Sequence, residues 1–419
     1  MAHQEVTGRR ARQARPPGAA EPILTRQMVL LLITSMGSLG SFYLLVPVVP
    51  LYAATTAGGV GAGLSTGAMM LATVLTELAV PRLLGRHGYR AVMALGLVLL
   101  GAPALLLTAW SALPLVLGVC LVRGAGLGIA VVAGTALIAD LTPAARRGEG
   151  LGLYGVAVGV PSIACLPLGL WLTVHLGYRP VFVAAAALSL LALAAAAGLP
   201  ARPARTGAAP SAGTGSARTG AAPMERPGLV LGVLRLPGLV RPAVVFAAVT
   251  LAAGVLLTFL PLAMSPGSRH LAAVALLVQS CATPLSRWIA GRYADRHGSA
   301  RLLVPAVLAA ALGTAGLVRV DSPPVVVACM GLFGIGFGIA QNVTLGLMFE
   351  RVPRPEFGRV SALWNLAYDA GMGVGAVGFG LLAGPVGYPR AFALTGAVLF
   401  VALVPAWRDR PRAARGEWG

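Results

Sequence analysis

The chain repeats itself at a constant spacing of 210 residues. The glycine-rich run GAGLGIA at Gly124–Ala130 returns as GIGFGIA at Gly334–Ala340. Further pairs keep the same register: Arg86, His87 and Gly88 with Arg296, His297 and Gly298; Asp140 with Glu350; Gly177 and Tyr178 with Gly387 and Tyr388. Self-similarity at a fixed period indicates a duplicated architecture. We therefore expect two similar halves.

The composition places both halves in a lipid bilayer. Hydrophobic residues make up 57% of the chain and charged residues 11%, with a mean hydropathy of +0.82. A soluble domain carries about 25% charged residues. The net charge of +19 is typical of nucleic-acid binding. Here, however, the arginines lie between apolar runs rather than on one soluble face, so we expect no nucleic-acid partner.

Twelve apolar runs are each long enough to cross a bilayer. They cover residues 28–52, 60–81, 89–110, 113–139, 150–174, 179–199, 241–264, 270–290, 300–319, 323–348, 360–384 and 389–407. Lipid cannot satisfy open backbone groups, and the runs lack the alternation of a barrel. The predicted fold is an all-α integral membrane protein with twelve transmembrane helices in two pseudo-symmetric six-helix bundles. Parallel repeats of this kind are typical of secondary transporters, with the site between them.

Arginine placement predicts the orientation. With the amino terminus in the cytoplasm, most of the 32 arginines fall on the cytoplasmic side, as the positive-inside rule requires. An even number of spans then puts both termini in the cytoplasm of an inner or plasma membrane. The expected segments are a disordered tail (1–27), a first bundle (28–199), a linker in which ARTGAAP occurs twice (200–240), a second bundle (241–407) and a tail (408–419).

One loop resembles a known family signature. The segment GRYADRHGSAR at Gly291–Arg301 is similar to the loop motif of the major facilitator superfamily, with matches at Gly291, Asp295, Arg296, Gly298 and Arg301. Its first-half counterpart, Pro81–Arg90, has Gly85 at the acidic position. The resemblance covers about residues 28–407. It implies a carrier that works by rocking its two halves.

Other features resemble the drug/proton antiporters of that superfamily. These exporters carry an arginine midway along the fourth helix before a glycine-rich run, and Arg123 matches it. Asp140 and Arg147-Gly148 match the following loop. The exporter motif of the fifth helix is incomplete: Gly155, Gly159 and Gly169 fit, whereas Pro167 is one residue off and Leu170 replaces a glycine. The resemblance implies a proton-coupled exporter.

Sites for other chemistry are not expected. The four cysteines fall inside apolar runs without metal-ligand spacing, and the chain has no ATP-binding loop. The glycines of Gly124–Ala130 have dinucleotide-fold spacing, but no strand precedes them, and close helix packing explains them better. We expect no enzymatic activity, no cofactor and no metal.

Polar residues found in only one half are candidates for a substrate or coupling cavity. Their pairing at the 210-residue spacing is Arg123 with Phe333, Gln341 with Val131, Asn342 with Val132, Asn365 with Gly155, and Asp369 with Gly159. A charge at mid-membrane is costly and needs a cavity or partner. Arg123 either holds an anionic group or braces its half through helix carbonyls. Asp369, the deepest carboxylate, either carries a proton or latches a gate.

A second group is expected at a cytoplasmic gate. It comprises Glu77, Arg82, Arg86, Asp140, Arg147, Asp295 and Arg296. Glu77 lies within reach of Arg82, so a salt bridge is the favoured role. Glu77 pairs with Arg287 across the repeat.

The sequence favours a secondary transporter that exports a small amphipathic or mildly anionic molecule in exchange for protons. In the family that the chain resembles, members that recognise cationic drugs often carry an acid in the first helix. Its absence here implies that a strictly cationic substrate is disfavoured. Two alternatives stay open: a proton-driven importer of a sugar or organic acid, and a sensor or scaffold without transport. We expect a monomer.

Overall fold

The computed structural model describes residues 24–142, 146–201, 238–353 and 356–409. The expected amino-terminal tail, most of the linker and nearly all of the carboxyl-terminal tail lie outside these ranges. In the described part the chain forms twelve long helices, joined by short turns and short 3-10 segments. No strand is formed by these residues. The predicted all-α fold is confirmed.

The helices follow the repeat. The first half holds α1 (Arg26–Leu45), α2 (Val48–Glu77), α3 (Val80–Gly101), α4 (Leu113–Leu141), α5 (Arg147–Leu176) and α6 (Tyr178–Ala196). The second holds α8 (Val240–Ala263), α9 (Arg269–His297), α10 (Ala300–Gly316), α11 (Pro323–Glu350), α12 (Phe357–Val386) and α13 (Tyr388–Arg408). The starts of α4, α5 and α6 lie 210 residues before those of α11, α12 and α13. The spacing read from the sequence is therefore the spacing of the helices.

One predicted boundary is confirmed and another was wrong. The first two spans, drawn as 28–52 and 60–81, flank the kink at Ala57 and Gly58 that interrupts α2. The predicted loop Pro81–Arg90 belongs to α3 and leaves helical geometry only at Gly88, where φ is 76°. The equivalent Gly298 has a φ of 83°. Glycine adopts positive φ without steric cost, so these residues let the chain turn sharply between helices.

Ten stretches are long and apolar enough to cross a membrane, by length and composition. The span from Arg26 to Glu77 counts as one of them, and α9 is not among them. Polar residues Gln279, Thr283 and Arg287 lower the hydropathy of α9. A spanning helix with a polar face places that face toward protein or a cavity, because lipid does not solvate it.

The repeated glycine runs pack helices closely, as predicted. A Cβ on Gly124 or Gly128 of α4 would lie 2.2 Å from the Met69 carbonyl or 2.8 Å from that of Thr73, both on α2. In the second half, the equivalent Gly334 and Gly338 approach the carbonyls of Gln279 and Thr283 on α9. The middle glycines, Gly126 and Gly336, face α3 and α10 instead. Each run thus lets its own helix pack closely against two neighbours, α4 against α2 and α3, and α11 against α9 and α10.

Gly124→Ala is expected to lower the thermal unfolding midpoint of the purified protein by several degrees. The added methyl meets a backbone carbonyl, and overpacking of this kind costs about 1–3 kcal/mol. Gly118 on the same helix has open space, because a Cβ added there would meet no atom within 4 Å. Gly118→Ala is therefore the control and gains about 0.5–1 kcal/mol from helix propensity. Equal midpoints for the two variants would contradict close packing at Gly124.

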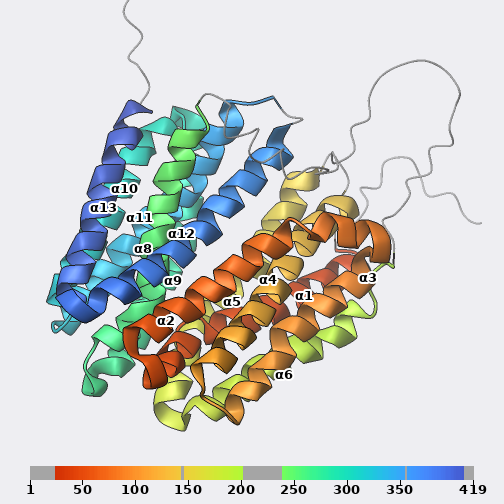
Figure 1. The fold of residues 1–419 in the computed structure, drawn as a ribbon. Coiled ribbons are helices and arrows are strands. Elements are labelled where there is room, and N and C mark those ends of the chain that lie inside the picture. Colours follow the sequence, from red (N-terminus) through yellow and green to blue (C-terminus); the bar gives the residue numbers. More distant parts are fainter. Residues whose placement is uncertain (1–23, 143–145, 202–237, 354–355, 410–419) are drawn as a thin grey trace, which may run out of the picture.

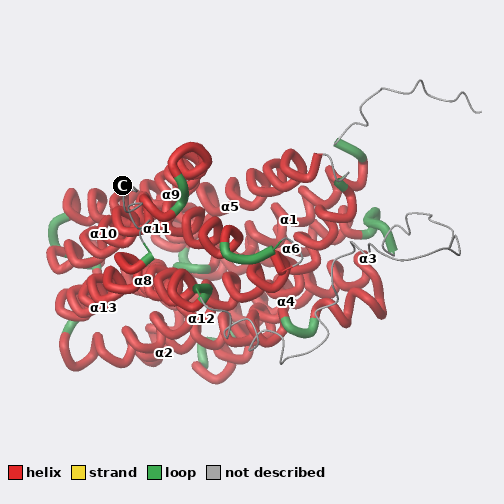
Figure 2. The backbone as a smooth tube through the Cα atoms, turned by 90° about the horizontal axis from the view of Figure 1, so that it is seen from above, coloured by secondary structure: helices red, strands yellow, loops and turns green. Residues whose placement is uncertain are grey.

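The two halves form two bundles that meet along α2 and α12, with a second contact between α5 and α9 (Figures 1 and 2). Backbones approach most closely where Gly59, Gly63 and Gly67 of α2 face residues 373–380 of α12. On this side Thr66 also hydrogen-bonds Thr258 of α8 at 3.0 Å. At the other end of α12, a Cβ on Gly358 would meet nothing within 4 Å.

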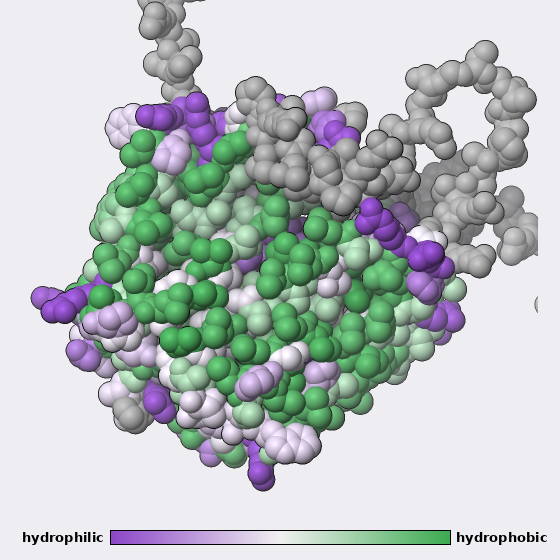
Figure 3. All heavy atoms as spheres, viewed as in Figure 1, coloured by the Kyte–Doolittle hydropathy of each residue, from purple (hydrophilic) through white to green (hydrophobic). Residues whose placement is uncertain are grey.

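The outer surface fits a bilayer. In the view of Figure 3 an apolar face covers both halves, and hydrophilic residues gather toward its edges. Large exposed hydrophobic residues from both halves include Leu191, Val401, Val374 and Trp407. A band of this kind is unfavourable in water and favourable in lipid.

Candidate functional site between the two halves

Asp369 lies deep in the molecule on α12. It follows the first residue of that helix, Phe357, by twelve positions, or about 18 Å at 1.5 Å per residue. This is deeper than expected, because α12 begins three residues before the predicted span. The side chain is 8% exposed. Its carboxylate forms no ion pair within the described residues.

A second carboxylate, from the other half, lies within electrostatic range of Asp369, with its Cγ packed near Gly128 of α4. Glu77 is the last residue of α2, the helix that packs along α12. In the described part of the chain, Glu77 has no ion pair with Arg82, whose side chain is exposed. The structure therefore brings together one residue predicted for the cavity and one predicted for the gate.

A guanidinium that was not predicted as part of the site lies in the same region. Arg287 of α9 donates a hydrogen bond to the Gln341 side-chain oxygen on α11 at 3.2 Å. It lies within electrostatic range of the hydroxyl groups of Tyr43 on α1 and Tyr368 on α12. Asp369 acts on the same two hydroxyls. Residues from five helices of both halves thus share one electrostatic environment.

The sequence held one signal for Arg287. It is the position that pairs with Glu77 at the 210-residue spacing, so the repeat places opposite charges at equivalent sites. Its place near the cytoplasmic end of an apolar run indicates an anchoring residue instead. The two tyrosines carried no signal, because aromatic residues in an apolar helix are usually packing residues.

The two predicted asparagines are placed apart. The side-chain nitrogen of Asn342 on α11 lies 3.2 Å from the Cβ position of Gly291 on α9, so it faces the inside of its own half. Asn365 on α12 is half-buried, one turn before Asp369. Neither forms a side-chain hydrogen bond within the described residues. Their cavity role stays a prediction.

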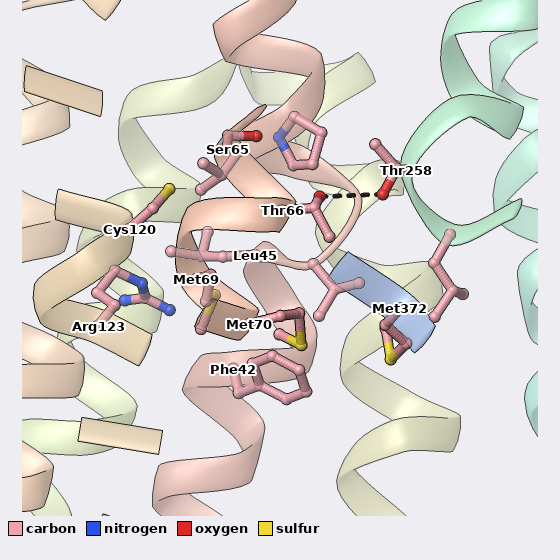
Figure 4. A pocket seen from close by; sticks show the side chains of 14 residues that line it. Phe42, Leu45, Ser65, Thr66, Met69, Met70, Cys120, Arg123, Thr258 and Met372 are labelled. Atoms are coloured by element: carbon pink, nitrogen blue, oxygen red, sulfur yellow. Dashed lines mark hydrogen bonds between the residues drawn. The ribbon is translucent and has the colours of Figure 1, made fainter. Parts of the chain in front are cut away.

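Arg123 is held by backbone carbonyls. The side chain is 1% exposed, and its guanidinium donates to the carbonyl oxygens of Leu100 on α3 and Ser41 on α1, the second at 3.2 Å. These bonds are those expected of a brace. Arg123 also borders a cavity of about 30 Å³ between the halves (Figure 4). The cavity is lined mainly by apolar side chains, among them Phe42, Met69, Met70, Leu257 and Met372.

The predicted gate residues form a different pattern. Asp140 accepts a hydrogen bond from the Tyr89 hydroxyl at 2.6 Å, and Glu350 accepts one from the Ser299 hydroxyl at 2.9 Å. The two bonds are equivalent in the repeat and join neighbouring helices within each half. Side chains of Arg86, Asp295 and Arg296 are exposed and make no ion pair in the described ranges. The Arg147 side chain lies outside the described residues.

The family follows from the sequence match. The model of the Major Facilitator Superfamily matches residues 31–376, and a second match covers 243–417. The chain belongs to the Major Facilitator Superfamily. It is therefore a multi-pass membrane protein with a transporter fold. No curated protein sequence matches the chain.

Solved structures of superfamily transporters have the same fold. A mutant of the nucleoside transporter NupG gives a TM-score of 0.73 at 13% identity over 91% of this chain and 99% of that chain. A D-xylose-proton symporter gives 0.72 at 16% identity, covering 92% and 98%. A bacterial homologue of the human lysosomal transporter Spinster gives 0.69 at 15% identity, covering 94% and 100%. At these identities the likeness shows the fold alone.

Membership of the superfamily directs attention to the interface between the two halves. In two-bundle carriers of this architecture the site lies where the halves meet, near mid-membrane. Among the described residues, the carboxylates of Glu77 and Asp369 and the Arg287 guanidinium are charged groups that lie at that interface. The sequence had predicted two of these three residues as functional.

Proposed function

We propose that this superfamily member is a proton-coupled secondary transporter for a small amphipathic or mildly anionic molecule. The observation that supports this most directly is the pair of carboxylates, Glu77 and Asp369, on opposite halves of the carrier. A transporter couples to protons when a group at the moving interface is charged in one state and neutral in another.

The pair links protonation to the movement of the halves. Two carboxylates at close range repel each other, and one shared proton removes the repulsion. Because Glu77 lies on α2 and Asp369 on α12, rocking changes the distance between them. Proton binding then favours the state in which the two acids are close. A ligand shifts such an equilibrium by its differential affinity for the two states.

The contacts between the halves indicate which side is closed. The closest backbone approaches lie at Gly59, Gly63 and Gly67, in the first part of α2. In the orientation predicted from the arginines, these residues lie on the outer side. We therefore assign this structure to a state closed outside and separated inside, with Glu77 at the inner end of α2.

Export by exchange with protons is the direction that the antiporter resemblance of Arg123 favours. One observation favours the second candidate, proton-driven movement of an organic acid. Arg287 shares its environment with the acid pair, and a guanidinium there suits an anion. A scaffold without transport would need neither the two acids nor their placement on opposite halves.

The test uses the purified full chain in lipid vesicles with an internal pH indicator. Candidate substrates are added with and without an imposed pH gradient. Coupled transport predicts that substrate addition moves protons even without an imposed gradient. It also predicts that a gradient accumulates substrate. Transport that is indifferent to the gradient would reject proton coupling, and a lack of transport for any class of organic solute would favour the scaffold.

A further inference from the structure

Arg287 has N–H donors that no acceptor in the described residues occupies, so it can bind an anion. It lies on α9, ten positions before the carboxyl-terminal end of that helix, and its side chain is exposed although α9 packs against both α11 and α5. A guanidinium presents five N–H donors in a planar fork. The Gln341 oxygen accepts from one of them. No other acceptor for Arg287 lies within hydrogen-bond distance in the described residues.

No carboxylate neutralises it by a direct contact. The ion pairs of the described residues join Arg146 to Glu149, Arg241 and Arg351 to Asp409, and Arg359 to Glu356. Arg287 is in none of them. A charge within a membrane-spanning helix is costly unless a partner or water compensates it. An anionic ligand would supply that compensation.

Aromatic rings from both halves lie within electrostatic range of Arg287. Tyr43 of α1 packs on Phe42 with ring centroids 4.9 Å apart. Tyr368 of α12 packs on Phe337 at 6.2 Å and on Trp364 at 6.1 Å. Both tyrosine side chains are partly exposed. Aromatic faces favour a planar apolar ligand through offset or edge-to-face contacts, while the phenol hydroxyls supply hydrogen bonds.

We infer that Tyr43, Arg287 and Tyr368 together bind a planar aromatic carboxylate, with its anionic group on Arg287 and its ring between the tyrosines. This inference rests on the proposed transport function and names its substrate class. A neutral sugar would offer no charge to the free donors of Arg287, and an organic cation would offer them no acceptor.

The position of the site determines whether proton and substrate move in the same direction or in opposite directions. Asp369 is adjacent in sequence to Tyr368 and shares its environment with Glu77 of α2, Tyr43 of α1 and Arg287 of α9. α8, α11 and α13 also pack on α12, and none of their described ionisable side chains forms an ion pair with Asp369. A bound anion disfavours negative charge on the acid pair, so it promotes proton binding. Reciprocity then requires that protonation strengthens binding of the anion. Proton and substrate therefore move in the same direction, which favours the organic-acid alternative over exchange.

The binding test uses a matched set of probes with purified full-length protein. Benzoate and 2-naphthoate are planar anions, benzamide is a neutral match, benzylammonium is a cation, and cyclohexanecarboxylate is a non-planar anion. Affinity is measured from tryptophan fluorescence and from the shift in thermal unfolding midpoint. We expect the two aromatic carboxylates to bind more tightly than the other three, and more tightly in mildly acidic than in mildly alkaline buffer.

Two variants locate the site. Arg287→Gln is expected to weaken 2-naphthoate binding roughly 10- to 100-fold, the equivalent of one charge-assisted interaction. Arg292→Gln is the matched control, because Arg292 lies on the same helix and stacks on Trp288 at 5.1 Å, outside the region of Tyr43 and Tyr368. Arg287→Lys keeps the charge without the fork and is expected to bind with intermediate affinity.

The outcomes separate this inference from the proposed function. Failure of both aromatic carboxylates to bind, equal binding of benzamide, or unchanged binding in Arg287→Gln overturns the assigned site, even where a pH gradient drives another solute. Normal binding with no proton movement in vesicles overturns proton coupling but leaves the site. Weaker binding in acidic buffer overturns the sign of coupling.

Discussion

Asp369→Asn is expected to abolish gradient-driven accumulation of substrate and to leave downhill exchange intact. Asparagine has nearly the same shape as the protonated acid and cannot release a proton. The variant therefore stays in the neutral form, which also removes its repulsion with Glu77. The measurement is uptake into vesicles with and without an imposed pH gradient, with expression and the unfolding midpoint as checks on folding.

Two further variants show whether the loss of accumulation is specific to Asp369. Asp321→Asn removes a carboxylate that is exposed next to the start of α11, far along the chain from the acid pair, and is expected to behave as wild type. Glu77→Gln removes the other member of the pair and is expected to reduce coupling as well. Full accumulation by Asp369→Asn with loss of accumulation by Glu77→Gln would move the proton site to Glu77. An unfolded Asp369→Asn would return Asp369 to the alternative role, a latch between α12 and the opposite half.

The architecture was readable from the sequence because duplication leaves a periodic record. The same spacing that aligned Gly124 with Gly334 also aligns the starts of α4 and α11. Membrane helices add a strong constraint, since lipid requires every backbone group to be bonded within the segment. Helix ends were less predictable. α1 ends at Leu45 and α2 begins at Val48, a break inside the predicted first span 28–52 that hydropathy does not record.

The comparison of halves also identified Asp369, because a scaffold that folds with Gly159 needs a separate reason for an acid at the equivalent site. The same comparison did not identify Arg287 as a site residue. An arginine near the end of an apolar run is usually an interfacial anchor. Only the structure shows that α9 continues to His297, which puts Arg287 well inside the helix and beside Gln341. Its aromatic neighbours come from α1 and α12, and contacts between distant helices leave no pattern along the chain.

Arg123→Met is expected to lower the thermal unfolding midpoint by several degrees, a larger effect on folding than on coupling. The guanidinium joins α4 to α3 through the Leu100 carbonyl and to α1 through the Ser41 carbonyl. Hydrogen bonds from a charged donor contribute about 1.5–3 kcal/mol each. Methionine keeps a long flexible side chain in the space but donates nothing, so α1, α3 and α4 lose their shared bond donor.

Arg123→Lys separates bracing from a role in transport. The ammonium group donates hydrogen bonds but lacks the planar fork that reaches two helices at once. Bracing predicts unfolding midpoints in the order wild type, lysine, methionine, with transport falling in parallel. A direct role at the cavity, which Arg123 borders, predicts unchanged midpoints and lost transport in both variants. The carbonyl contacts favour the first outcome, because a guanidinium already bonded to Leu100 and Ser41 has fewer donors left for a substrate than Arg287 has.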